Sequence, residues 1–210
     1  MSRKHRQDDS PPAKEIQEAR LSVDDYGLSW LVALQTGSVW GHCYENSYAS
    51  FFAFPALFDP SGRLIEGWMV FEEPDRVVLM EHGWLAGGSH IIDPTIVFAV
   101  NPGQPVYYFP GVERGRSELE RLENQFFPHV RFCDYGADGM GHPGYRAAFN
   151  AAHQKARLLC SSGKALSCVR ATMLGPQEEA RGQEEAGRRA VIVLLPDHRG
   201  REETDEKKRV

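Results

Sequence analysis

LIEGWMVFEEPDRVVLMEHGWLAGGSHIIDPTIVFAV, residues 64–100, contains three extended apolar runs separated by short turn sequences. The runs cover residues 64–72, 76–86 and 90–100. Pro74 lies in the first separator and Gly87–Gly88 in the second, and both residue types favour turns. Strands joined by such short turns lie antiparallel, because a parallel pair needs a crossover of a dozen or more residues. The stretch therefore predicts the centre of an antiparallel sheet.

Helices are predicted on both sides of these strands. CYENSYASFFAF (43–54) is compatible with a helix that Pro55 ends. The remaining predicted elements are a short strand at 105–109 and helices around 117–126 and 145–159. The sequence thus predicts an α+β fold, in which the helix that begins near Cys43 packs on an antiparallel sheet and further helices follow toward the C-terminus.

A length of 210 residues fits one domain of ordinary size with tails. Residues 1–20 are polar and charged and predict a disordered arm. Residues 21–170 are expected to form the folded domain, and residues 171–210 a charged tail. The tail contains an apolar segment, VIVLLP (191–196), which could dock on the body as a strand or meet a partner.

Charge and composition argue against several classes of protein. The formal net charge is −5 with acidic and basic residues interspersed, which gives no support to nucleic-acid binding. No apolar run approaches the roughly 20 residues needed to span a bilayer, and no apolar signal region follows the basic N-terminus. We therefore expect a cytoplasmic protein that binds neither nucleic acid nor membrane. Its four cysteines form no CxxC pair and are expected to be free thiols.

Three residues in the predicted elements have reactive side chains of complementary types. Cys43 falls in the first turn of a helix, where unpaired N–H groups and the helix dipole favour the nucleophilic thiolate. A hairpin centred on Gly87–Gly88 pairs residues whose numbers sum to about 175, which places Asp93 beside His82 on one face. There the carboxylate would orient the imidazole and stabilise its protonated form. The sequence therefore predicts a catalytic triad formed by Cys43, His82 and Asp93.

Other interpretations of the same residues stay open. Cys43 could be an ordinary packed thiol, because free cysteines are often buried. His82 could be a satisfied core residue, and Asp93 could form only an Asx turn in Asp-Pro-Thr. A non-catalytic protein-binding module could keep all three for packing. They could also converge on a metal ion, although no short-spaced pair of ligands supports a metal site. No cofactor is expected.

GHCYENS (41–47) resembles the nucleophile segment of papain-like cysteine proteases, which carry Gly-x-Cys-aromatic-x-x-Ser at the start of a helix. The order of the triad, with Cys first and then His and Asp on successive antiparallel strands, is shared by the wider superfamily. That superfamily includes transglutaminase-like enzymes and arylamine N-acetyltransferases. The chain also resembles small uncharacterised proteins of bacteria and their phages, through the segments EGWMV, EHGWL and IIDPT. The resemblance covers about residues 35–110.

The resemblance implies a compact Cys-His-Asp enzyme. Papain separates its Cys and His by considerably more residues, whereas 39 positions (82 − 43) separate Cys43 from His82 here. This spacing suits a transglutaminase-like or minimal papain-fold enzyme better than a digestive protease. The implied activity is that of a hydrolase or acyl transferase that acts on an amide or ester through a thioester. Its substrate would be a protein, a peptide or a small amide.

Three further residues are predicted on the substrate side of the site. Gln35, eight positions before Cys43 (43 − 35), matches the oxyanion glutamine of papain in type but at a longer spacing. The backbone N–H of Cys43 is the alternative oxyanion donor. Asn46 faces the same side of the helix as Cys43 and could bond the strand beneath. Trp84 is expected to form part of the core and of the cleft wall.

Overall fold

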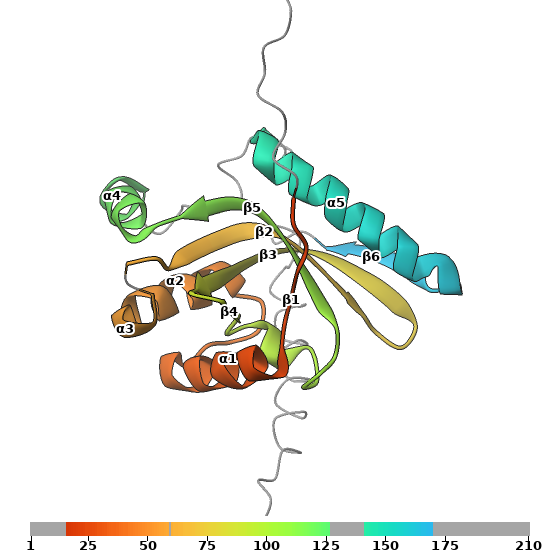
Figure 1. The fold of residues 1–210 in the computed structure, drawn as a ribbon, viewed down its shortest axis with the longest axis horizontal. Helices are drawn as coiled ribbons and strands as arrows, with labels where there is room; N and C mark the ends of the chain where they lie inside the picture. Colours follow the sequence, from red (N-terminus) through yellow and green to blue (C-terminus); the bar gives the residue numbers. More distant parts are fainter. Residues whose placement is uncertain (1–15, 59, 127–140, 170–210) are drawn as a thin grey trace, which may run out of the picture.

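The computed structural model describes residues 16–58, 60–126 and 141–169, which form an α+β fold of helices on a six-stranded sheet (Figure 1). The predicted fold class is confirmed. The helices are α1 (Val23–Thr36), α2 (Cys43–Ala53), α3 (Pro55–Phe58), α4 (Arg116–Phe126), α5 (Pro143–Leu159) and the 3₁₀ helices η1 (Ile96–Phe98) and η3 (Cys160–Ser162). The strands are β1 (Ala19–Arg20), β2 (Arg63–Glu72), β3 (Arg76–Gly87), β4 (His90–Ile92), β5 (Val106–Arg114) and β6 (Ala165–Val169).

The sheet is mixed, so the prediction of a wholly antiparallel sheet is wrong in one strand. Five strands follow the order β1-β5-β2-β3-β4 and lie antiparallel to their neighbours. β6 pairs in parallel with the first half of β3. The chain can return in this direction because α5 precedes β6 and supplies the long crossover that parallel pairing requires.

β3 has a gap in its pairing along one edge. β6 pairs with residues 76–80 of β3 and β4 pairs with residues 85–87. Between them, residues 81–84 have only β2 as a neighbouring strand within the described part of the chain. An edge of this kind leaves backbone groups that need other partners.

The first turns of α2 cover this gap. The Ser47 hydroxyl donates to the carbonyl oxygen of Gly83 at 3.0 Å. A Cβ atom at Gly83 would lie 3.4 Å from the Cα of Tyr44 and 3.7 Å from the carbonyl carbon of Cys43. The absence of a side chain at Gly83 therefore lets the start of α2, and with it Cys43, lie directly against the edge of β3.

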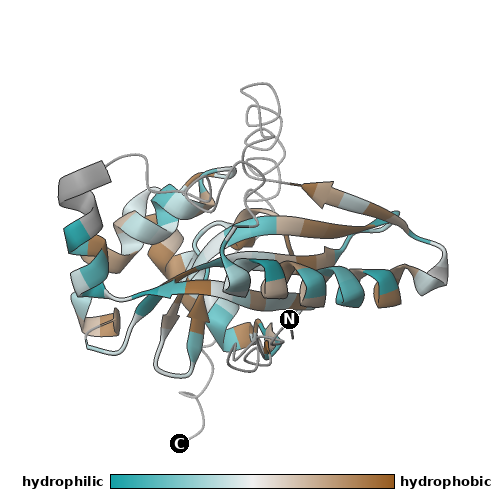
Figure 2. Ribbon diagram, turned by 90° about the horizontal axis from the view of Figure 1, so that it is seen from above, coloured by the Kyte–Doolittle hydropathy of each residue, from teal (hydrophilic) through white to brown (hydrophobic). Residues whose placement is uncertain are grey.

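Side chains that alternate along the strands form core layers on both faces of the sheet. On one face the sheet packs against α5, through Trp68, Val70, Leu79, Phe109, Tyr145, Ala148, Ala152 and Ala156. On the other face it packs against the segment around η1 and the N-terminal side of α1, through Met69, Met80, Trp84, Ile96, Val100 and Tyr108. Figure 1 shows α5 and α1 on opposite sides of the strands. Figure 2 shows alternating hydrophilic and hydrophobic stretches along α5, as expected for a helix with one buried face.

Several predicted boundaries differ from the structure, among them that of the short strand predicted at 105–109, which forms β5 and extends to Arg114. The run 90–100 forms a strand only as far as Ile92, because Pro94 has no N–H for a ladder and the chain turns into η1. Residues 16–20 do not belong to a disordered arm, since Ala19 and Arg20 pair with Tyr108 and Tyr107 of β5. Residues 1–15 and the predicted tail 171–210, with its apolar segment, lie outside the described residues.

None of the helices in the described ranges is long and apolar enough to cross a membrane.

Candidate active site

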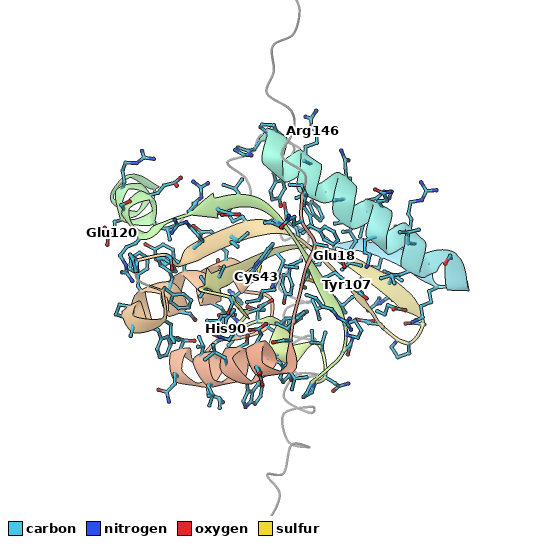
Figure 3. All side chains as sticks on the ribbon, in the orientation of Figure 1. Glu18, Cys43, His90, Tyr107, Glu120 and Arg146 are labelled. Carbon is cyan, nitrogen blue, oxygen red and sulfur yellow. The ribbon has the colours of Figure 1, made fainter. Side chains whose placement is uncertain are left out.

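Cys43 is the first residue of α2, as predicted. The preceding residue, His42, makes no side-chain hydrogen bond that caps the helix. The backbone N–H of Cys43 finds no acceptor among the described residues. Cys43 is 8% exposed, so its surroundings are mostly protein. In Figure 3 it lies beside the sheet in the interior, whereas Glu120 and Arg146 lie on the outer helices.

His82 and Asp93 form a buried hydrogen-bonded pair. The Nε2 atom of His82 lies 2.7 Å from Oδ2 of Asp93, and the two side chains are 1% and 0% exposed. Nδ1 of His82 has no hydrogen-bond partner within the described part of the chain. The Cys43 thiol lies close enough to affect the ionisation of the ring. The structure therefore brings the three predicted triad residues together, with Nδ1 as the ring nitrogen left for the thiol.

The ionisation of His82 reflects both neighbours. Complete burial by itself lowers the pKa of His82, but the charge of Asp93, the charge of the nearby Cys43 and the hydrogen bond to Asp93 raise this pKa from 6.5 to about 10. The imidazole is consequently protonated at neutral pH. A protonated imidazole beside a cysteine is the arrangement that stabilises a thiolate nucleophile.

The predicted register of the β3–β4 hairpin is wrong by two residues. Leu85 pairs with Ile92 and Gly87 with His90, so paired numbers sum to 177 (85 + 92) and not to 175. Asp93 lies just after β4 and is not a cross-strand neighbour of His82. A two-residue shift preserves the face on which side chains point, and Asp93 reaches His82 from the turn that follows β4.

Four donors surround the Asp93 carboxylate. Oδ2 accepts from His82 and from the Tyr108 hydroxyl, the latter at 2.8 Å. Oδ1 accepts from the backbone N–H groups of Thr95 and Ile96, both at 3.0 Å. Through Oδ1, Asp93 forms the Asx turn that is the alternative interpretation of the Asp-Pro-Thr sequence. Through Oδ2, the same side chain orients His82. A carboxylate has about four lone-pair sites, and all are used.

Neighbouring helices hold this turn in place. The backbone N–H of Asp93 donates to Ser29 Oγ at 2.8 Å, and the Ser29 hydroxyl donates to the carbonyl oxygen of Asp25 at 2.6 Å. Asn46 of α2 donates to Thr95 Oγ1 at 2.9 Å and to the Val39 carbonyl oxygen at 2.6 Å. The expectation that Asn46 bonds the strand beneath is therefore wrong. Asn46 instead ties α2 to the turn that carries Asp93.

The two other residues predicted on the substrate side have different surroundings. Trp84 is 2% exposed. Its ring is nearly parallel to that of His82, with centroids 6.4 Å apart, and lies 5.0 Å from the Tyr108 ring. Trp84 therefore belongs to the core, as predicted, where it supports the imidazole. Gln35 is exposed on α1, and no contact among the described residues places it beside the thiol.

The three triad residues are not arranged as a metal site. The described ranges contain no group of three or more His, Cys, Asp and Glu side chains that could hold a metal ion. Both oxygens of Asp93 accept hydrogen bonds from the protein, and one of them is the partner of His82. The alternative that Cys43, His82 and Asp93 bind a metal ion therefore finds no support in the geometry.

The raised pKa of His82 predicts how stability depends on pH. Because the pKa is higher in the folded than in the unfolded protein, the stabilisation by the charged ring is complete below about pH 6.5 and is lost as pH rises toward about 10. Urea unfolding across this range should show a decline that is much smaller in His82→Gln. His90→Gln is the matched control, because His90 pairs with Asp25 with its side chain 51% exposed, and it should keep the decline. Equal slopes in wild type and His82→Gln would contradict the prediction.

Comparison of the chain with protein-family models, with curated protein sequences and with solved structures finds no match. The relationship to papain-like and transglutaminase-like enzymes that GHCYENS suggests therefore stays a prediction.

Proposed function

We infer that this protein is a cysteine-dependent hydrolase or acyl transferase that acts on an amide or ester carbonyl through a thioester intermediate. The observation that carries this inference is the buried His82 ring, which Asp93 holds at 2.7 Å through Nε2, whose Nδ1 has no other partner among the described residues, and which has the Cys43 thiol nearby. The proposed roles follow from these contacts. Cys43 is the nucleophile, His82 transfers the proton, and Asp93 orients the ring.

The chemical step requires no group beyond these residues. The Cys43 sulfur attacks the carbonyl carbon, and the negative charge moves to the carbonyl oxygen. The backbone N–H of Cys43 at the start of α2, which has no acceptor among the described residues, would donate to that oxygen. Collapse of the intermediate breaks the bond to the leaving group, which takes the proton from His82, and leaves a thioester on Cys43. Water or an amine then attacks the thioester and releases the acyl group.

The substrate class remains that implied by the resemblance, namely a protein, a peptide or a small amide. Peptide cleavage, glutamine deamidation and transamidation share the thioester and differ only in the leaving group and in what resolves it. The short spacing between Cys43 and His82 favours a compact transglutaminase-like or minimal papain-fold enzyme over a digestive protease.

Competitive labelling of the cysteines with iodoacetamide at neutral pH tests the proposed function. Cys43 is buried, Cys160 is half-buried and Cys168 is exposed. Among these three described cysteines, exposure alone therefore predicts that Cys168 reacts first and Cys43 last. If His82 activates the thiol, the order inverts and Cys43 reacts fastest, because the thiolate is the reactive form. The rate at each site can be measured by mass spectrometry of peptides from a time course.

His82→Ala supplies the control within the same experiment. It should slow the labelling of Cys43 and leave the rates at Cys160 and Cys168 unchanged. If wild-type Cys43 reacts no faster than Cys160, the thiol is not activated, and the non-catalytic protein-binding module becomes the better interpretation.

A further inference from the structure

Tyr108 shares the oxygen of Asp93 that contacts His82. Tyr108 lies in β5 and is 0% exposed. Its hydroxyl donates to Asp93 Oδ2 at 2.8 Å, and the same oxygen lies 2.7 Å from His82 Nε2. His82 in β3 and Tyr108 in β5 therefore contact the same oxygen atom from two strands that are not adjacent, because β2 lies between them.

Gly67 and Trp84 make this approach possible across the intervening strand. Gly67 of β2 is the direct neighbour of His82 in β3. A Cβ atom at Gly67 would lie only 3.0 Å from Cη2 of Trp84 and 2.3 Å from the carbonyl oxygen of Phe109. The Trp84 indole therefore lies over Gly67, and it contacts the rings of both His82 and Tyr108. The two donors are held against Asp93 by a packed aromatic layer.

The Tyr108 hydroxyl stays protonated and can therefore always donate a hydrogen bond to Asp93. Burial, followed by the charge of Asp93 and the hydrogen bond to it, raises the pKa of Tyr108 well above 10, with a smaller effect of Asp25. The phenol consequently keeps its proton over the range in which His82 changes charge. A donor to a carboxylate disperses part of its negative charge, and the Asp93 charge that remains for His82 is reduced.

We propose that Tyr108 is a positioning residue of this site: its hydroxyl fixes Asp93 Oδ2 at His82 and withdraws charge from it, so that the imidazolium releases its proton to the leaving group more easily. This role rests on the proposed function. The simpler role of a buried hydroxyl that only needs an acceptor predicts no effect on the ionisation of His82.

The sign of the effect follows from the charges around the ring. Asp93 after β4 and Cys43 of α2 raise the pKa of His82. Without the Tyr108 hydroxyl, the full charge of Asp93 acts on His82, and the pKa of His82 rises further. Alkylation of Cys43 by iodoacetate reports this change, because the anionic reagent is attracted by the imidazolium and its rate falls when His82 loses its proton.

The test compares Tyr108→Phe with Tyr26→Phe. Tyr26 packs against the same core layer, and its hydroxyl donates to the carbonyl oxygens of Val97 and Val100 and not to Asp93. In Tyr108→Phe, the pH at which the rate of Cys43 alkylation by iodoacetate falls (the basic limb of the pH–rate profile) should rise by about one pH unit. The downfield proton resonance of His82 Nε2–H should also shift. In Tyr26→Phe both should stay at their wild-type positions.

Substitution of 3-fluorotyrosine for Tyr108 covers the case in which Tyr108→Phe does not fold. The fluorinated phenol keeps the ring and hydroxyl but donates more strongly, so the limb should move to lower pH. If the basic limb of the pH–rate profile and the His82 Nε2–H resonance stay unchanged in the folded Tyr108 variants, the proposed role of Tyr108 is wrong. Fast labelling of Cys43 would in that case still support the proposed enzyme. Slow labelling of wild-type Cys43, in contrast, rejects the proposed function itself.

Discussion

Replacement of Asp93 by alanine is expected to destabilise the protein by about 3–5 kcal/mol, because it leaves a buried charged partner without its counterion. His82 loses the carboxylate at 2.7 Å, and the hydroxyl of Tyr108 loses its acceptor. Two backbone N–H groups of the following turn also lose theirs. Since whole domains are stable by about 5–15 kcal/mol, Asp93→Ala should be only marginally folded.

Urea unfolding at pH 7 measures this effect, with Asp25→Ala as the matched control. Asp25 is also buried, at 5% exposure, but its carboxylate accepts from the Ser22 N–H at the start of α1 and pairs with the exposed side chain of His90. Loss of such a capping contact costs about 1 kcal/mol. If Asp93→Ala costs no more than Asp25→Ala, the carboxylate does not organise the site.

Asp93→Asn should fall between wild type and Asp93→Ala. All four groups around the carboxylate are donors to it. An amide has one acceptor oxygen, so its NH₂ group must face either the turn or the His82–Tyr108 side. If it faces His82, the imidazole must carry its proton on Nδ1, which is the wrong tautomer for reaction with Cys43.

If Cys43 is the nucleophile as proposed, its replacement by alanine is expected to abolish turnover, with a loss on the order of 10⁵–10⁶-fold, as for removal of the nucleophile in triad enzymes. The fold should persist, because the change removes one sulfur atom at the start of α2 and no contact of Ser47 or Asn46. Cys43→Ser should be nearly as inactive, since a hydroxyl is far harder to ionise than a thiol.

Hydrolysis of an activated ester such as p-nitrophenyl acetate, together with mass spectrometry of the acylated protein, measures this loss. Cys160→Ala and Cys168→Ala are the controls and should retain turnover, because Cys160 lies at the end of α5 and Cys168 in β6. Turnover or an acyl adduct that survives in Cys43→Ala would refute the assignment of the nucleophile.

The long strands and the meeting of His82 with Asp93 could be predicted because their signals are local. Apolar runs bounded by Pro74 and by the paired glycines define β2 and β3 closely. The hairpin register was wrong because the turn consists of Gly88 and Ser89, with Gly88 at φ 61°, and not of the two glycines. His82 and Asp93 still met, because an even shift keeps the face and the turn after β4 supplies the remaining reach.

Other features were missed for different physical reasons. α1 was not predicted, although its signal is present: Ser22 and Asp25 form a capping box and Gly37 ends the helix at φ 64°. The parallel pairing of β6 and the contact of Tyr108 with Asp93 have no local signal. Both depend on how distant strands are ordered in the sheet.

The gap along β3 predicts a link between the proposed chemistry and aggregation. The carbonyl group of Gly83 faces the gap and accepts from Ser47, and the N–H of a strand residue points to the same side as its carbonyl. When the first turn of α2 lifts away, Cys43 leaves His82 and a bare strand edge is exposed, which is a template for pairing with another molecule. Inactivation and the onset of aggregation should therefore follow from one local opening. Whatever holds α2 against β3 should slow both.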